Sequence, residues 1–271
     1  MQERVAAGAD GELLSESLEL GIVVLTLNRP KARNALSLSM LTSLRQAFDT
    51  IGRDTSVAAI VLAANGPVFC SGHDLKEMTA RRGDADGGKA FFDLTMTTCA
   101  AMMQSIVKCP RPVIAAVEGP ASAAGAQLIA TCDMAVAAAS ATFTTPGVNI
   151  GLFCSTPMVA LSRNLPRKRV MEMLLLGEAL DAQSAAEFGL VNRVVEASKV
   201  REEAISMART IASKSRMTVA IGKEAFYRQV EMPLGDAYDY AARVMVENMM
   251  IRDANEGICA FIEKRPPTWK D

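Results

Sequence analysis

Two short, glycine-containing segments of the sequence carry residue types that could stabilise a negatively charged oxygen. Segment 69–76 is Phe-Cys-Ser-Gly-His-Asp-Leu-Lys, and segment 118–128 is Glu-Gly-Pro-Ala-Ser-Ala-Ala-Gly-Ala-Gln-Leu. Each follows an apolar, strand-like run and leads into a helix-like one, and its small residues let a ligand approach the backbone closely. Two such turns can direct two backbone N–H groups at one oxygen, which is how an enzyme stabilises an enolate or a tetrahedral oxyanion.

Apolar runs predict the elements that position these turns. The predicted strands are 22–27, 57–63, 113–117 and 134–138. Because the runs lack polar alternation and are separated by helical stretches, we expect mostly parallel pairing with both faces covered. A helix is predicted after Ser37 or Ser39, since its apolar residues recur with a period of 3.6: Met40, Leu41, Leu44, Phe48 and Ile51.

The pattern becomes helical beyond Thr156. The predicted helices cover 170–177, 180–189, 199–213, 218–230, 234–250 and 253–264, with a short strand at 191–195. The last two helices carry Met245, Met249, Met250, Ile251, Ile258 and Phe261. A terminal region this apolar must cover either the protein's own core or a neighbouring subunit.

Composition narrows the class of protein. The chain has 271 residues, half of them apolar, which is enough for one large domain or a domain with an appendage. Its net charge of −1 gives a nucleic-acid partner no electrostatic support. Six cysteines without C-x-x-C spacing indicate buried thiols in a reducing compartment, and a single histidine, His73, makes a metal site unexpected.

The N-terminal residues bear on location. Residues 1–19 contain five acidic side chains and no apolar core of the kind found in secretory signals, and transit peptides are poor in acids. The small-residue run 114–141 is interrupted by Glu118, Gln127 and Asp133, so we expect no bilayer-spanning segment and no membrane partner. These features predict a cytoplasmic protein.

Together with 27–30 (Leu-Asn-Arg-Pro), 34–36 (Asn-Ala-Leu) and Cys132-Asp133, the two turns resemble the crotonase superfamily, the enoyl-CoA hydratase/isomerase group. The resemblance runs from about Leu18 to the C-terminus. It implies an α/β fold, namely a crotonase-like superhelix of ββα units with a C-terminal helical oligomerisation region.

The same resemblance divides the chain into two parts. Residues 1–200 would form the crotonase core, which binds acyl-CoA, and residues 201–271 the C-terminal helical region. The implied assembly is a homotrimer or a hexamer made of two trimers. The implied partner is an acyl-CoA thioester, with CoA as part of the substrate and no separate cofactor.

In this family the thioester carbonyl lies between two backbone donors, which the resemblance places at the N–H groups of His73 and Ala124. The predicted helix that begins near Ala124 would add positive potential through its dipole. One such donor is worth about 3–4 kcal/mol in a transition state. The resemblance implies these substrate-binding residues: Lys31, Arg33, Ala35, Ser71, Gly72, His73, Asp74, Leu75, Ala123, Ala124 and Gly125.

Basic residues could meet the CoA phosphates. Lys31 and Arg33 are candidates, as are Lys264 or Lys270 of a neighbouring subunit. For each single one, a solvated surface position is the favoured interpretation.

The catalytic positions that the resemblance implies hold His73, Ala124, Gln127 and Gly147, and the sequence departs from the family at the last two. Hydratases use two glutamates, the first of them three residues after the second donor, where this chain has Gln127. The second follows a proline in a Phe-x-x-Pro-Glu pattern, where this chain has Gly147. Because each acid–base group contributes about 10²–10⁴-fold, hydration by the usual route should be severely impaired.

Other side chains are weaker candidates for proton transfer. His73 has an imidazole that titrates near neutrality, but a structural or CoA-contacting role is favoured over a catalytic one. A nucleophilic Cys154 would need an activating base that the sequence does not offer, so a packed thiol is favoured. We expect Asp74 to cap a helix and Asp133 to hold a loop.

These observations favour an acyl-CoA thioester-binding protein that stabilises a thioester enolate and has doubtful activity as a hydratase or isomerase of fatty acid metabolism. One alternative is a non-catalytic acyl-CoA-binding or regulatory module, and another is a CoA-thioester hydrolase or decarboxylase of the same fold. Within the family, Gln127 and the run 145–157 resemble the enoyl-CoA hydratase domain-containing protein 3 type, which also lacks the usual acids.

Overall fold

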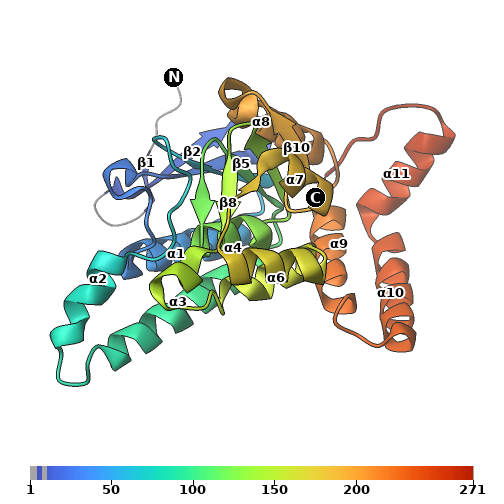
Figure 1. Cartoon of the computed structure of the whole chain (residues 1–271). Helices are drawn as coiled ribbons and strands as arrows, with labels where there is room; N and C mark the ends of the chain where they lie inside the picture. The colour runs from blue at the N-terminus through green and yellow to red at the C-terminus, as the bar shows by residue number, and fades with distance from the viewer. Residues whose placement is uncertain (1–4, 8–10, 271) are drawn as a thin grey trace.

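The computed structural model describes residues 5–7 and 11–270, and a seven-stranded sheet forms its centre (Figure 1). In spatial order the strands are β1 (Val5–Ala6), β2 (Leu13–Leu18), β3 (Ile22–Leu27), β4 (Ala59–Ala64), β5 (Val113–Val117), β7 (Met134–Ala138) and β10 (Arg193–Val195). The sheet is parallel from β3 onward, which confirms the predicted pairing. The antiparallel edge formed by β1, β2 and β3 was not predicted.

A second layer of short strands lies beside the main sheet. It contains β6 (Ala121–Ser122), β8 (Thr142–Thr144) and β9 (Leu180–Asp181). Two isolated bridges connect neighbouring segments: Leu36 pairs with His73, and Cys70 pairs with Ala121 at the start of β6. A long strand, a short strand and a helix follow one another, as in β5, β6 and the helix Ala124–Thr131, and the predicted superhelix of ββα units is confirmed.

Helices follow these strands and cover the sheets. They are α1 (Leu38–Arg53), α2 (Leu75–Ala80), α3 (Lys89–Lys108), α4 (Ala124–Thr131), α5 (Pro157–Asn164), α6 (Arg167–Leu176), α7 (Ala182–Phe188), α8 (Val200–Ala212), α9 (Arg216–Gln229), α10 (Leu234–Met249) and α11 (Arg252–Ile262). Ser37 caps α1 by accepting a hydrogen bond from the N–H of Met40 at 3.2 Å, as predicted.

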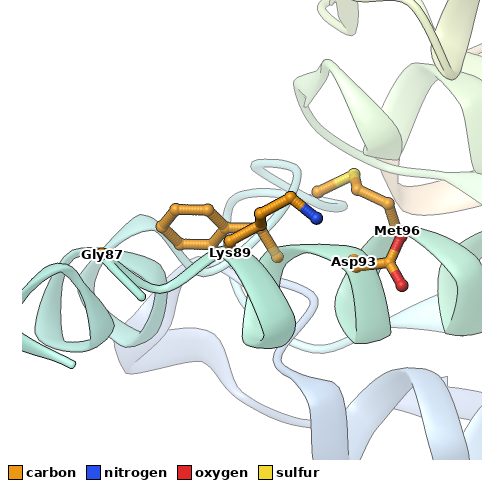
Figure 2. Close-up of a pocket in the computed structure, with 5 residues that line it drawn as sticks. Gly87, Lys89, Asp93 and Met96 are labelled. Carbon is orange, nitrogen blue, oxygen red and sulfur yellow. The ribbon is translucent and has the colours of Figure 1, made fainter. Parts of the chain in front are cut away.

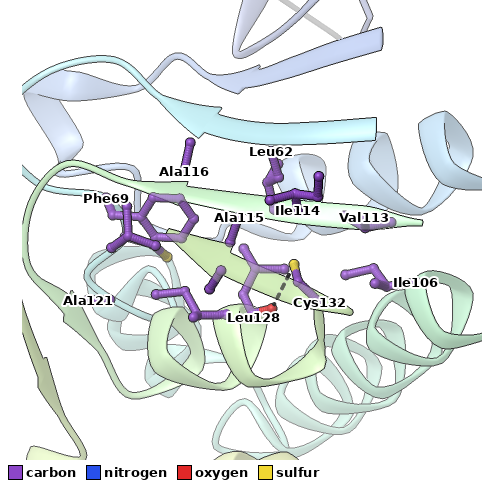
Figure 3. Close-up of a cluster of buried hydrophobic side chains, with 14 of the residues drawn as sticks. Leu62, Phe69, Ile106, Val113, Ile114, Ala115, Ala116, Ala121, Leu128 and Cys132 are labelled. Atoms are coloured by element: carbon purple, nitrogen blue, oxygen red, sulfur yellow. Dashed lines mark hydrogen bonds between the residues drawn. The ribbon is translucent and has the colours of Figure 1, made fainter. Parts of the chain in front are cut away.

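Helix α4 is the element that matters most for the candidate site. All eight of its residues are buried, because its sequence contains only small, apolar or amide side chains and one threonine. Figure 3 shows Leu128 and Cys132 facing the side chains of β5, with Phe69 beside them. The helix is therefore held against the sheet along its whole length, and its N-terminus has a defined position.

Helix α3 is long and apolar enough to cross a membrane by length and composition alone, which the sequence interpretation overlooked. A core helix of a globular domain passes the same test, and α3 packs along α1. Its buried face includes Cys99, Met102 and Ile106. We therefore interpret α3 as a packed helix of this fold.

The C-terminal helices α10 and α11 stand away from the sheet in Figure 1. The tail after α11 folds back, and the indole N–H of Trp269 donates to the carbonyl oxygen of Ser213 at 2.8 Å. More than half of the surface of several large apolar side chains on α10, α11 and the turn between them is exposed: Leu234, Tyr238, Met245, Val246, Met249, Met250, Phe261 and Ile262. The predicted apolar tail therefore does not cover the core of its own chain.

Candidate functional site

The two turns singled out in the sequence lie side by side. The N–H of Ser122 donates to the carbonyl oxygen of Cys70 at 2.9 Å, in the bridge between Cys70 and Ala121. A Cβ atom added to Gly72 would lie 3.4 Å from the nitrogen of Ala124 and 3.1 Å from the oxygen of Ser122. The backbone of the first turn is therefore in contact with the start of α4.

Glycine is required at two positions by this close approach. Gly72 has φ +92°, which residues with a side chain rarely adopt. A Cβ atom on Gly125 would lie only 2.3 Å from the carbonyl oxygen of Cys70. A larger residue at either position would push the two turns apart, so both glycines help to fix their separation.

Two backbone donors are left available at this junction. Leu36 donates to the oxygen of Gly72 at 2.8 Å and accepts from the N–H of Asp74 at 3.1 Å, so the N–H of His73 points away from residue 36. Ala124 begins α4, and a helix leaves its first N–H groups without intrahelical partners. Among the hydrogen bonds of residues 5–7 and 11–270, neither the His73 N–H nor the Ala124 N–H has an acceptor.

The backbone of Ala123 is strained where it precedes these donors. Ala123 has φ +49° and ψ −115°, a conformation that residues other than glycine seldom adopt. Its N–H donates to the carbonyl oxygen of Thr144 at 2.8 Å, which holds the strained residue in place. Strain of this kind persists only where the surrounding structure holds the residue in place, and such positions cluster at ligand-binding sites.

A buried asparagine supports the first turn from below. The side chain of Asn34 is fully buried, and its Oδ1 accepts from the N–H of Arg29 at 2.8 Å. Its Nδ2 donates to the oxygens of Asn65 at 2.9 Å and Val68 at 2.8 Å. One amide thus joins three loops around segment 69–76. The sequence interpretation used Asn34 only as part of a motif and missed this role.

Arg29 is the second support that the sequence interpretation missed. Its guanidinium donates to the oxygen of Ala35 at 2.6 Å and forms ion pairs with Asp74 at 3.1 Å and Glu12 at 2.7 Å. Asp74 also caps α2, as predicted. Burial alone would raise the pKa of Asp74, but the hydrogen bonds from the N–H of Glu77 and from Arg29 outweigh it and lower the pKa. The residue that follows His73 is therefore a firmly held carboxylate.

The two positions at which the resemblance implies glutamates have no side chain that can transfer a proton. Gln127 is buried, and its only hydrogen bonds among the described residues are made by its backbone. Gly147 is buried as well, and a Cβ atom there would lie 2.9 Å from the oxygen of Leu152 and 3.0 Å from Sγ of Cys154. Burial raises the pKa of the Cys154 thiol, as expected for a packed thiol rather than a nucleophile.

The imidazole of His73 does not titrate near neutrality, and that expectation is wrong. Burial lowers its pKa to about 4, because the charged form is poorly solvated there. Its Nε2 atom is buried without a hydrogen-bond partner. At neutral pH the side chain is therefore a neutral ring.

The remaining predicted contacts lie around the first turn. Lys31, Arg33 and Leu75 are exposed, whereas Ala35 is buried. The N–H of Ser71 donates to the oxygen of Arg33 at 3.1 Å, so these two segments run side by side. The structure thus brings the predicted residues of 31–35, 71–75 and 123–127 into one region, with two exposed cationic side chains at its edge.

Two hollows lie elsewhere. One of about 370 Å³ is lined by Gly87, Lys89, Phe92, Asp93 and Met96, and Figure 2 shows Lys89, Asp93 and Met96 along the first turns of α3. Another of about 330 Å³ is lined by Arg252, Asp253, Glu256, Arg265, Thr268 and Lys270. Of the residues that the resemblance suggested, only Lys270 lines either hollow. Within residues 5–7 and 11–270, no three His, Cys, Asp or Glu side chains are grouped as metal ligands would be.

The fold agrees with comparisons to known proteins. A sequence model of the family described as enoyl-CoA hydratase/isomerase matches residues 17–271, and the chain belongs to this family. The human enoyl-CoA hydratase domain-containing protein 3, mitochondrial, is 48% identical over 92% of this chain and 80% of its own. This match confirms the predicted likeness to that type.

Two crystal structures are similar along nearly the whole chain. An enoyl-CoA hydratase of Mycobacterium smegmatis has 49% identity and a TM-score of 0.91, covering 95% of this chain and 98% of its own. The human domain-containing protein 3 has 46% identity and a TM-score of 0.90, covering 95% of this chain and all of its own.

These relatives correct one expectation. The rat, human and mouse proteins of this type are all named as mitochondrial, so the predicted cytoplasmic location is wrong. The prediction rested on the acidic composition of residues 1–19.

Proposed function

We propose that the chain binds an acyl-CoA thioester, with the thioester oxygen between the N–H groups of His73 and Ala124. The observation that carries this proposal is the contact between the turns, where a Cβ atom on Gly72 would lie 3.4 Å from the nitrogen of Ala124. Both N–H groups lack acceptors among the described residues. The N-terminus of α4 adds a positive potential at the same point.

In this proposal the protein binds the thioester but hydrates it poorly. Hydration needs one group to deliver a proton and another to activate water, and Gln127 and Gly147 can do neither. The neutral His73 ring and the protonated Cys154 thiol do not replace them, since burial disfavours the charged form of both. These side chains favour the non-catalytic binding module over a hydrolase, which would need a nucleophile or an activated water.

The test separates binding from turnover. Calorimetry with butyryl-CoA should show binding to the purified protein, whereas hydration of crotonyl-CoA should be at least about 10³-fold slower than by a two-glutamate relative assayed beside it. Malonyl-CoA would be included to detect hydrolysis or decarboxylation. Hydration at the rate of the relative would overturn the proposed lack of proton transfer, and no binding of any thioester would overturn the proposed ligand.

We further propose that the chain assembles with copies of itself as a trimer or a pair of trimers, the assembly that the family resemblance implies. The support is the exposed apolar side chains of α10 and α11, of which Met250 is 81% and Phe261 is 85% exposed. Exposed patches of this kind usually mark an interface. Light scattering of the purified protein measures the number of copies directly.

A further inference from the structure

The guanidinium of Arg29 connects the residues on either side of the bridge that contains the first donor. This bridge pairs Leu36 with His73. Arg29 donates to the oxygen of Ala35, the residue before Leu36, at 2.6 Å. It also donates to Oδ2 of Asp74, the residue after His73, at 3.1 Å. Because a guanidinium is planar and rigid, these two bonds fix the two strands of the bridge relative to each other.

The loop that Arg29 closes is strained. Arg33 has φ +52° and Asn34 has φ +51°, in the left-handed region that residues other than glycine seldom adopt. The N–H of Asn34 donates to the carbonyl oxygen of Arg29 at 2.9 Å, and the side-chain bond to Ala35 closes the loop a second time. Without the guanidinium the loop can relax, and its bridge partner His73 would move with it.

Glu12 holds the same guanidinium from the opposite side. Its Oε1 lies 2.7 Å from Nε of Arg29, and the two side chains are 24% and 18% exposed. Glu12 directly precedes β2, and its carbonyl oxygen accepts from the N–H of Asn28 at 2.7 Å. The antiparallel edge of the main sheet thus delivers a carboxylate to Arg29. All three nitrogens of the guanidinium are then used, by Glu12, Ala35 and Asp74.

The second oxygen of Glu12 indicates that this carboxylate is kept for something other than stability. Oε2 is buried without a hydrogen-bond partner among the described residues. A buried acceptor without a donor lowers the stability of the folded state. Departures of this kind are expected at functional sites, where they are tolerated for the sake of the site. Glu12 contributes to the site only through Arg29, whose direction it fixes.

We propose that Glu12 and Arg29 are positioning residues, which direct the N–H of His73 at the thioester oxygen by holding Ala35 and Asp74. This inference rests on the proposed function, since the oxygen is the group that this N–H would bind. A hydrogen bond weakens steeply as its angle departs from linearity, so a small rotation of the turn is enough to lose it. The effect is therefore confined to ligands that carry the oxygen.

The test compares butyryl-CoA with S-butyl-CoA, a thioether that has two hydrogen atoms in place of the carbonyl oxygen. Two net hydrogen bonds predict that the wild type binds the thioester about 10-fold more tightly, as measured by calorimetry. Glu12→Met removes the carboxylate at similar length, and Arg29→Lys keeps the charge but cannot hold three acceptors in one plane. In each variant the loss of one of the two bonds should reduce the preference to about 3-fold, by weakening the thioester.

Two substitutions of the same kinds serve as controls. Glu19 follows the other end of β2 and Arg53 ends α1, and both are exposed. Glu19→Met and Arg53→Lys should keep the wild-type preference for the thioester. Thermal unfolding shows whether each variant is folded. A merely destabilised variant would keep the ratio of the two affinities, because the folded fraction binds both ligands.

The outcomes separate this inference from the proposal beneath it. If the wild type prefers the thioester and both Glu12→Met and Arg29→Lys keep the full preference, the positioning role is wrong and the two-donor site stands. If the wild type binds the thioester and the thioether equally, no donors reach the oxygen, and the proposed function fails together with this inference. If neither ligand binds, the proposed ligand itself is wrong.

Discussion

Lys223 and Asp133 form a buried ion pair that fastens the C-terminal helices to the core. Nζ of Lys223 lies 2.6 Å from Oδ2 of Asp133, with the two side chains 6% and 15% exposed. The same ammonium group donates to the oxygens of Ile106 and Arg111, both at 3.1 Å. Asp133 also accepts from the hydroxyl of Tyr227 at 2.9 Å. Helix α9 is thus attached to the segments that precede β5 and β7, and the loop role predicted for Asp133 is confirmed.

Lys223→Met should destabilise the protein by about 3–5 kcal/mol, because it leaves the Asp133 carboxylate partly buried without its cation. Urea unfolding at pH 7 measures the loss. Lys214→Met, at an exposed position before α9, is the control and should change stability by less than about 0.5 kcal/mol. Equal effects of the two substitutions would contradict a structural role for the pair.

Gly72→Ala should weaken binding of butyryl-CoA by at least about 10-fold, because displacing the first turn moves the His73 N–H away from that of Ala124. The added Cβ would meet the Cβ of Ala123 and the oxygen of Ser122, both at 3.1 Å, at a residue with φ +92°. Gly87→Ala is a matched control, since Gly87 has φ +68° and no neighbouring atoms within 4 Å. The control should lose about 1 kcal/mol of stability and keep its affinity. Calorimetry and urea unfolding of both variants check the two effects.

Elements with continuous apolar runs and strong breakers were predictable from the sequence. The bounds of β5 and β7 agree with the prediction, because each run is buried in a parallel sheet, and polar Glu118 follows β5 while polar Asp133 precedes β7. Strand β2 was missed because its Ser15, Glu16 and Ser17 interrupt any apolar run. Its strand conformation comes from antiparallel pairing with β3. Helix α3 was missed because its apolar residues do not form a clear stripe.

The turns of the site could be predicted, but not what supports them. Glycines and small residues are a local signal, and they correctly placed the contact between Gly72 and the start of α4. The ion pair of Arg29 with Asp74 joins residues 45 positions apart, and the amide of Asn34 reaches Val68, 34 positions away. No local pattern reports such partners. The low pKa of His73 also follows from burial, which only the folded chain creates.

His73 should make stability fall as the pH decreases from about 6.5 to about 4. The folded state holds the imidazole neutral, with a pKa of about 4 against 6.5 unfolded, so only the unfolded chain takes up the proton in this window. The contribution of the neutral ring to the free energy of unfolding is fully present above pH 6.5, and about 3 kcal/mol of it is lost by pH 4. Urea unfolding from pH 8 to 4 should show this loss relative to His73→Gln. Because His73 is the only histidine, a matching profile in the variant would contradict the buried neutral ring.

Met250→Glu and Phe261→Glu should each break the assembly into smaller species, because a carboxylate would be buried in the apolar interface proposed for α10 and α11. The two side chains are 81% and 85% exposed in the single chain, so neither change should unfold it. Arg243→Glu introduces the same group at an exposed polar position of α10 and serves as the control. Light scattering measures the mass of each variant. If only Arg243→Glu broke the assembly, the interface would not involve Met250 and Phe261.

Adding both family glutamates should not create a hydratase unless space is made for the second one. The side chain of a Gly147→Glu variant would begin 3.0 Å from Sγ of Cys154 and 2.9 Å from the oxygen of Leu152, so the new carboxylate is displaced or the loop moves. We therefore expect Gln127→Glu with Gly147→Glu to hydrate crotonyl-CoA no faster than the wild type. Adding Cys154→Ala removes the sulfur atom and should raise the rate by at least about 10²-fold, the contribution of one acid–base group.

The control for this gain is Cys259→Ala in place of Cys154→Ala, since Cys259 lies on α11 and is half-buried. Hydration is followed by the loss of the enoyl absorbance. If the variant with two glutamates is already as fast as the one with Cys154→Ala, the thiol does not obstruct position 147. If the variant with Cys154→Ala binds butyryl-CoA normally and remains inactive, a missing carboxylate is not what limits hydration. The backbone donors at His73 and Ala124 would then be wrongly positioned for this reaction.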